Sequence, residues 1–169
     1  MGKAKALVDT DVVSFFFNDS QLSIPYRQYL RKRALCISFM TRAEIEQGMR
    51  LDNWGEKKRG EMESFLATKF AVIHTNDAIC LKWAEITSLR GRPVSPADAW
   101  IAATAIVYKV PLITHNRKHF EGIAGLKVIS EGKYLIFAQI ERQFIIGECG
   151  FDCRRQGMSP IECNLLNMP

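Results

Sequence analysis

Short apolar segments alternate with segments of helical character along most of the chain. The segments that we predict as strands are 4–8, 35–37, 70–73, 111–114 and 126–129. Each is short and mostly apolar, which is typical of strands buried on both faces. The alternation predicts an α/β fold with a central parallel sheet of about four to five strands and helices on both faces.

Capping residues mark two of the expected helix starts. Thr41 stands three residues before Glu44, which fits a capping box and makes Thr41 the expected N-cap. Ser95 directly precedes Pro96, the arrangement expected for an N-cap and a first helical residue. The helices expected from these and other signals are 12–17, 25–33, 41–50, 56–69, 76–90 and 96–106.

Composition excludes several classes of protein. The chain has 169 residues, and its hydrophobic content of 47% is that of a folded globular protein. No apolar run reaches the roughly 18 residues that a membrane-spanning helix needs. Five cysteines without a signal peptide indicate reduced thiols, so we expect a cytoplasmic protein that does not bind membranes.

The C-terminal part of the chain differs in character from the rest. Residues 133–169 carry four basic and four acidic residues, so the net charge of +5 belongs to residues 1–132. We expect one domain over 1–132 and a C-terminal extension over 133–169, in which the only expected element is a helix at 134–146. The positive charge of the domain favours a polyanionic partner such as nucleic acid.

Three acids and one asparagine follow predicted strands or begin the helices after them. Asp9 lies directly after the first predicted strand, and Glu44 lies in the first turn of the helix after the second. Asp98 begins a later helix, and Asn116 closely follows the fourth predicted strand. Ligands of open α/β sheets bind beyond the carboxyl ends of the strands, so these four side chains can point into one crevice.

A crevice of this kind favours a hard divalent cation. Three carboxylates repel one another unless a cation neutralises them, and oxygen ligands without a His or Cys cluster favour Mg²⁺ or Mn²⁺ over zinc. A metal-bound water can attack a phosphodiester. Taken singly, Glu44 and Asp98 are also explained as acids that complement a helix dipole. Asp9 is harder to explain in this way, because an acid at the end of a buried strand is costly without a partner.

The sequence resembles the PIN-domain family, and within it the VapC-type toxin ribonucleases of type II toxin–antitoxin systems. The order and spacing of the family motifs match over about residues 5–130. The segments that carry the resemblance are 7–14, 38–48, 97–105, 111–116, 118–120 and 125–129. The resemblance implies a PIN-like three-layer α/β/α fold. It also implies that Asp9, Glu44 and Asp98 bind the metal.

Four further positions are interpreted through this resemblance. Asn116 falls on the fourth acidic position of the family, where Asp and Asn both occur. Asp11 stands where the family often has Asn, and it either adds charge to the site or caps the first helix. Thr114 either touches the scissile phosphate or packs within the strand. His119 stands where an Asp before Phe is common, and a supporting or surface role is expected for it.

The resemblance implies a Mg²⁺-dependent endoribonuclease toxin, with Mn²⁺ as the other candidate ion. We expect hydrolysis by a metal-activated water that leaves 5′-phosphate and 3′-hydroxyl ends, because the acids cluster and the chain offers no His pair for 2′-hydroxyl chemistry. The implied partners are an RNA substrate, a cognate VapB-like antitoxin and a second copy of the chain in a homodimer. Toxins that this chain resembles differ in target among tRNA, rRNA and mRNA, and the sequence does not identify which of these is cleaved.

Two alternatives remain at this point. Asp9-Thr10-Asp11 after a strand also fits the DxD motif of haloacid-dehalogenase (HAD)-type phosphatases, with Asp9 as the nucleophile. The single acid Asp98 within a helix fits the downstream motif of that family poorly. The second alternative is a catalytically silent PIN binding module, in which the residues after 132 block or replace catalysis.

Overall fold

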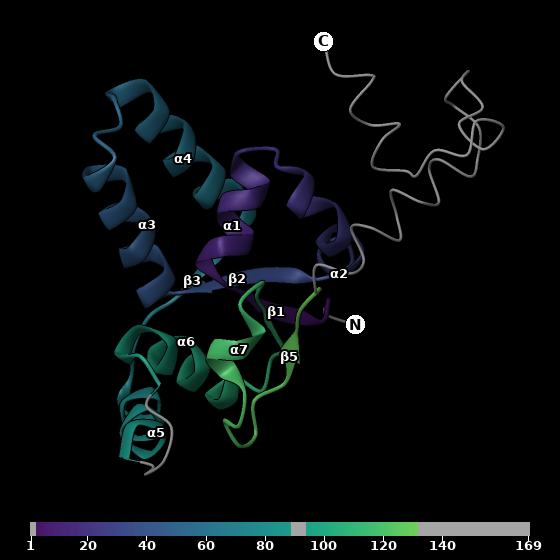
Figure 1. The fold of residues 1–169 in the computed structure, drawn as a ribbon, viewed down its shortest axis with the longest axis vertical. Coiled ribbons are helices and arrows are strands. Elements are labelled where there is room, and N and C mark those ends of the chain that lie inside the picture. The colour runs from purple at the N-terminus through teal and green to yellow at the C-terminus, as the bar shows by residue number, and fades with distance from the viewer. Residues whose placement is uncertain (1–2, 89–93, 132–169) are drawn as a thin grey trace, which may run out of the picture. The chain divides into compact units, whose positions relative to one another are not determined.

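One parallel sheet forms the centre of the computed structural model, which describes residues 3–88 and 94–131 (Figure 1). Within the described residues its strand order is β3-β2-β1-β4-β5, and every adjacent pair is parallel. The strands are β1 (Lys5–Val8), β2 (Ala34–Ser38), β3 (Ala71–Ile73), β4 (Leu112–Ile113) and β5 (Val128–Ile129). The predicted C-terminal extension and its helix at 134–146 lie outside the described residues.

Strand register brings the carboxyl ends of the strands to one edge. In β1, Leu7 is paired with Cys36 of β2 and also with Leu112 of β4. The last residue of β1, Val8, is paired with Ile113, which is the last residue of β4. The residues that directly follow β1, β2 and β4 therefore begin their connections at the same edge of the sheet.

Helices follow most of the strands. They are α1 (Thr10–Phe17), the 3-10 helix η1 (Gln21–Tyr26), α2 (Arg27–Leu30), α3 (Phe39–Leu51), α4 (Glu56–Lys69), α5 (Asp77–Ser88), α6 (Pro96–Val107) and α7 (Arg117–Phe120). Within the described residues, none of these helices is both long and apolar enough to cross a bilayer.

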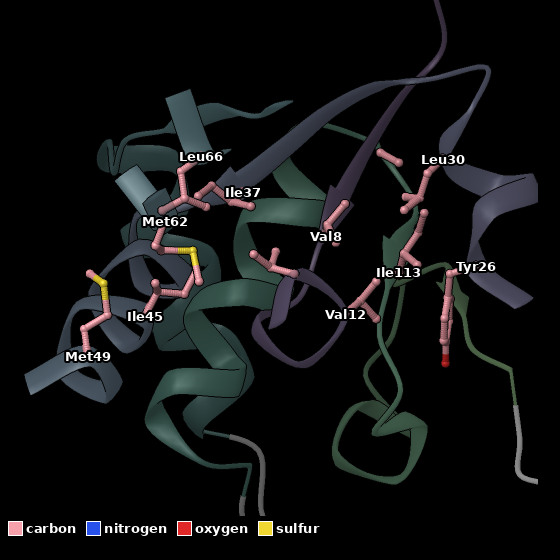
Figure 2. Close-up of a cluster of buried hydrophobic side chains, with 12 residues drawn as sticks. Val8, Val12, Tyr26, Leu30, Ile37, Ile45, Met49, Met62, Leu66 and Ile113 are labelled. Carbon is pink, nitrogen blue, oxygen red and sulfur yellow. The ribbon is translucent and has the colours of Figure 1, made fainter. Parts of the chain in front are cut away.

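Alternate strand residues build two separate cores, one on each face of the sheet. Val8, Ile37 and Ile113 pack with buried side chains of α1, η1, α2, α3 and α4, a cluster that Figure 2 shows. The intervening residues Leu7 and Leu112 pack with α5, α6 and α7 on the other face. Strand side chains alternate between faces, so short, almost wholly apolar strands can fill both cores. The predicted three-layer α/β/α fold is confirmed.

The start of α3 differs from the prediction. Its N-cap is Ser38, whose Oγ accepts a hydrogen bond from the Thr41 N–H at 2.9 Å. Thr41 is therefore inside the helix, and Glu44 lies in its second turn instead of its first. The predicted N-cap Thr41 was wrong because β2 ends at Ser38 and α3 begins directly after it, which places the Thr-x-x-Glu pattern inside the helix. The predicted N-cap Ser95 of α6 is confirmed, since its Oγ accepts from the Asp98 N–H at 3.1 Å.

The segment predicted as one helix over 25–33 is divided. It begins inside η1, which contains Pro25, and continues as the single turn of α2. The α-helical part is short because β2 begins at Ala34, so the chain leaves the helix soon after Leu30. The one-turn helix α7 was not predicted.

Gly48 offers a test of how tightly α3 is packed. A Cβ added to Gly48 meets no atom within 4 Å, and the same is true of Gly60 in α4. We expect Gly48→Ala and the control Gly60→Ala each to raise the free energy of unfolding by about 0.5–1 kcal/mol, because alanine favours a helix interior. Denaturation in urea measures the change. A loss of stability in Gly48→Ala alone would show that this glycine is needed for packing.

Candidate active site

Asp9 joins the carboxyl ends of β1 and β4. It is the N-cap of α1, and its Oδ1 accepts a hydrogen bond from the Thr10 N–H at 2.8 Å. Its Oδ2 accepts from the Thr114 Oγ1 at 2.7 Å. The residue is only 7% exposed. Thr114 is fully buried, so the structure supports its packing within the protein and gives its hydroxyl a partner in Asp9.

The charge on Asp9 is poorly compensated. Burial raises the pKa of Asp9, and the negative charges of Asp11 and Glu44 raise it further; the hydrogen bonds from Thr114 and Thr10 oppose the rise, and the resulting pKa is about 7. None of the ion pairs between described residues includes this carboxylate. Asp9 is thus a buried acid among other acids.

Glu44 faces the start of α1 from the second turn of α3. The Thr10 hydroxyl donates a hydrogen bond to its Oε2. Burial raises the pKa of Glu44, the hydrogen bond from Thr10 lowers it, and the charges of Asp98 and Asp11 raise it. Glu44 therefore lies within electrostatic reach of Asp9 on one side and of Asp98 on the other.

Asp98 lies in the first turn of α6 and keeps its capping geometry. Its Oδ2 accepts a hydrogen bond from the Ser95 Oγ at 2.6 Å. The Nδ1 of His119, in α7, lies 3.5 Å from the same oxygen. His119 is thus beside one of the predicted metal ligands. Its side chain is also more than half exposed, so the expected supporting or surface role stays a prediction.

Asp11 holds the loop between β4 and α7. Its Oδ1 accepts from the Val12 N–H at 2.6 Å, and its Oδ2 accepts from the N–H groups of His115 and Asn116 at 2.9 and 3.2 Å. Burial raises the pKa of Asp11, while these backbone donors lower it. Of the two roles considered, the N-cap role belongs to Asp9. Asp11 contributes charge and anchors the loop that carries Asn116.

The exposed residue Asn116 begins α7 without capping it through its side chain. Its N–H is used twice, since it also lies 3.0 Å from the Thr114 Oγ1. The structure therefore places Asn116 on the same loop as Thr114, next to the acids at the carboxyl edge of the sheet. Sequence reasoning missed Thr10, because a threonine in the first turn of a helix carries no signal of its partner.

The donor set has the chemistry of a magnesium site, since all of its members offer oxygen. Hydrogen bonds from Thr114, Thr10 and Ser95 hold one oxygen each of Asp9, Glu44 and Asp98. Among residues 3–88 and 94–131, no three His, Cys, Asp or Glu side chains stand together in an arrangement that holds a metal ion. The metal site therefore stays a prediction, which rests on the type and mutual repulsion of these side chains.

Comparison with known proteins identifies the family. The PIN domain family model matches residues 6–126. Ribonuclease VapC1 of Haemophilus influenzae strain R2866 is 32% identical over 126 residues, which cover 72% of this chain and 93% of the relative. The tRNA(fMet)-specific endonuclease VapC of Shigella flexneri is 27% identical over 126 residues, which cover 73% of this chain and 95% of the relative.

A solved structure shows the same fold. VapBC-1 from nontypeable Haemophilus influenzae has a TM-score of 0.59 at 27% identity, covering 75% of this chain and 97% of the matched chain. The family-model match extends over most of the sequence and includes Asp9, Glu44, Asp98 and Asn116. The chain therefore belongs to the PIN-domain family and is of the VapC type.

Proposed function

We propose that this protein is an endoribonuclease toxin that a cognate antitoxin holds inactive. The observation that carries the proposal is the group of acids at the carboxyl edge of the sheet, where Asp9 is buried and the charges of Asp11 and Glu44 act on it. Relatives named as VapC ribonucleases and the neighbour named as a VapBC complex support the nuclease activity and the antitoxin partner. RNA as the substrate and a homodimer as the assembly remain proposals.

The cofactor that we propose is Mg²⁺, with Mn²⁺ as the other candidate. Asp9, Glu44 and Asp98 would hold it, with Asn116 beside them as a neutral oxygen donor. When bound, the ion supplies an activated water and neutralises negative charge on the phosphodiester. The residues of the chain prepare this site, since Thr114 fixes the orientation of Asp9 and Asp11 fixes the loop that carries Asn116.

Neither alternative function gains support from the site. The phosphatase alternative needs a downstream acidic motif, and Asp98 is a single acid in the first turn of α6. A binding module without catalysis does not require acids that repel one another, and this repulsion costs stability. The proposed nuclease uses that repulsion to favour a cation.

The first functional prediction separates metal binding from helix capping. We expect the wild-type protein to cleave total RNA with Mg²⁺ but not with EDTA, and to leave 5′-phosphate ends. Asp98→Asn keeps the size of the side chain and an oxygen that can accept the hydrogen bond from the N-cap residue Ser95. It should lower Mg²⁺ affinity in calorimetry by more than about tenfold and abolish cleavage, since loss of residues that only support metal ligands already costs 10–100-fold.

A matched control comes from α5. Asp77 is also an acid in the first turn of a helix, but its charge is not among those that raise the pKa of Asp9 or Glu44. Asp77→Asn should cleave RNA normally, and both variants should lose less than about 1 kcal/mol of stability if helix-dipole effects alone act. A folded Asp98→Asn protein with normal cleavage would remove Asp98 from the site. Ends that carry a 2′,3′-cyclic phosphate would contradict the proposed hydrolysis.

Stability should depend on pH in a direction set by Asp9. Its pKa is raised from 3.8 to about 7 by folding, so the folded state holds a proton that the unfolded state releases. The stabilisation is therefore complete below pH 3.8 and is lost as pH rises through about 7. In EDTA, the melting temperature should fall as pH is raised across this range. Asp9→Asn should weaken that dependence, and Mg²⁺ should weaken it in the wild-type protein.

A separate groove suits the antitoxin. It has a volume of about 890 Å³ and lies where β1, β2 and β3 begin, at the edge of the sheet opposite Asp9. Its apolar wall includes Phe16, Leu30, Phe65 and Phe70, and its basic residues include Lys3, Arg27, Arg31 and Lys69. We propose that an amphipathic antitoxin segment with acidic residues binds here, because its apolar face and its charge would both be complemented.

Charge reversal in this groove should separate antitoxin binding from catalysis. We expect Arg31→Glu/Lys69→Glu to weaken capture of the antitoxin encoded by the neighbouring small gene, and to leave RNA cleavage at the wild-type rate. The control Lys57→Glu/Lys127→Glu reverses the same number of charges outside the groove. Equal capture by both double variants would show that the antitoxin binds elsewhere. Pull-down after co-expression, followed by cleavage assays on the free proteins, measures both effects.

A further inference from the structure

The loop over residues 114–116, which carries Asn116, is also hydrogen-bonded to a buried tyrosine, Tyr26. Tyr26 ends η1 and is fully buried. Its hydroxyl lies 3.0 Å from the His115 Nδ1 and 3.4 Å from the Thr114 carbonyl oxygen. The Glu131 N–H donates to the same hydroxyl at 3.2 Å. Figure 2 shows the ring of Tyr26 with its hydroxyl directed away from the apolar cluster.

The nearest hydrogen-bond partner of the hydroxyl is the Nδ1 of His115. The carbonyl oxygens of Thr114 and Glu131 lie further away, at 3.4 and 3.3 Å. The edge-to-face contact of Phe15 with the His115 ring, at 5.3 Å between centroids, restricts that ring from a second side. The side chain of His115 is therefore fixed between η1 and α1, two elements distant from it in sequence.

The same loop is also hydrogen-bonded to the carboxylates of Asp9 and Asp11. The N–H groups of His115 and Asn116 donate to Asp11, and the Asn116 N–H also lies 3.0 Å from the Thr114 Oγ1. That hydroxyl in turn donates to Asp9. One continuous set of hydrogen bonds thus runs from the Tyr26 hydroxyl, through residues 114–116, to the two carboxylates.

We propose that Tyr26 is a positioning residue of the nuclease site and acts through His115 and the Thr114 carbonyl. It holds the loop so that the Thr114 hydroxyl keeps its hydrogen bond to Asp9 and Asn116 stays beside Asp11. The loop has no strand or helix to hold it between Ile113 and Arg117, so its shape depends on these side-chain contacts. This inference rests on the proposed function, since it assigns a role within that site.

Tyr26→Phe tests the proposal by removing one hydroxyl and keeping the ring. Tyr29→Phe is the matched control, because the Tyr29 hydroxyl bonds the Glu131 side chain and makes no contact with the loop among the described residues. We expect Tyr26→Phe to lower kcat for RNA cleavage by about tenfold or more, the effect typical of groups that orient metal ligands, with KM nearly unchanged. Tyr29→Phe should keep the wild-type kcat.

A second measurement does not require activity. Amide hydrogen exchange at His115 and Asn116 should be faster in metal-free Tyr26→Phe than in the wild type or in Tyr29→Phe. If the wild-type protein fails to cleave RNA, the proposed function fails, and this exchange measurement still decides the role of Tyr26. Unchanged exchange at both amides, with unfolding the only property altered in Tyr26→Phe, would overturn the proposal.

A double variant tests whether Tyr26 acts through His115. His115→Phe keeps a ring against Phe15 and removes the nitrogen that is hydrogen-bonded to Tyr26. Combined with Tyr26→Phe, it should lower kcat no further than either single change, because both remove the same contact. Losses that multiply in the double variant would show that the two residues act independently and would overturn this route.

Discussion

The arrangement of the proposed site depends on one buried carboxylate, that of Asp9, directly after the central strand β1. β1 lies between β2 and β4, so Asp9, the residue directly after it, is enclosed by protein. A buried anion is costly unless donors or cations surround it. Thr114 and the first amide of α1 supply donors, whereas Asp11 and Glu44 add negative charge. These donors compensate the negative charge of Asp9 only in part, and a bound cation would compensate it further.

Local signals in the sequence were sufficient to predict the five strands, most of the helices and the position of Asp9 directly after β1, but not η1 or α7. Each strand is short and mostly apolar, and the acid directly follows one of them. The start of α3 was missed because Ser38 ends a strand and caps a helix at the same time. Thr10 and Tyr26 could not be found, because their partners are 34 and 89 residues away and no periodicity connects them.

The two edges of the sheet have opposite chemical character. The carboxyl edge gathers Asp9, Asp11, Glu44 and Asp98, and the amino edge borders a groove with an apolar wall and several cations. Parallel strands make this separation possible, because all of their connections start at one edge and return to the other. The proposed nuclease chemistry and the proposed antitoxin contact can therefore be altered independently by mutation.

The pairing of β1 with β4 also has a consequence for biosynthesis. Asp9 leaves the ribosome early, but Thr114, which orients it, is 105 positions later in the chain. β1 has no partner on its β4 side until that late segment has been made. A nascent chain therefore carries Asp9 before Thr114 is available to orient it. For a protein proposed to cut RNA, the topology of the sheet delays activity until the ribosome has finished synthesising the domain.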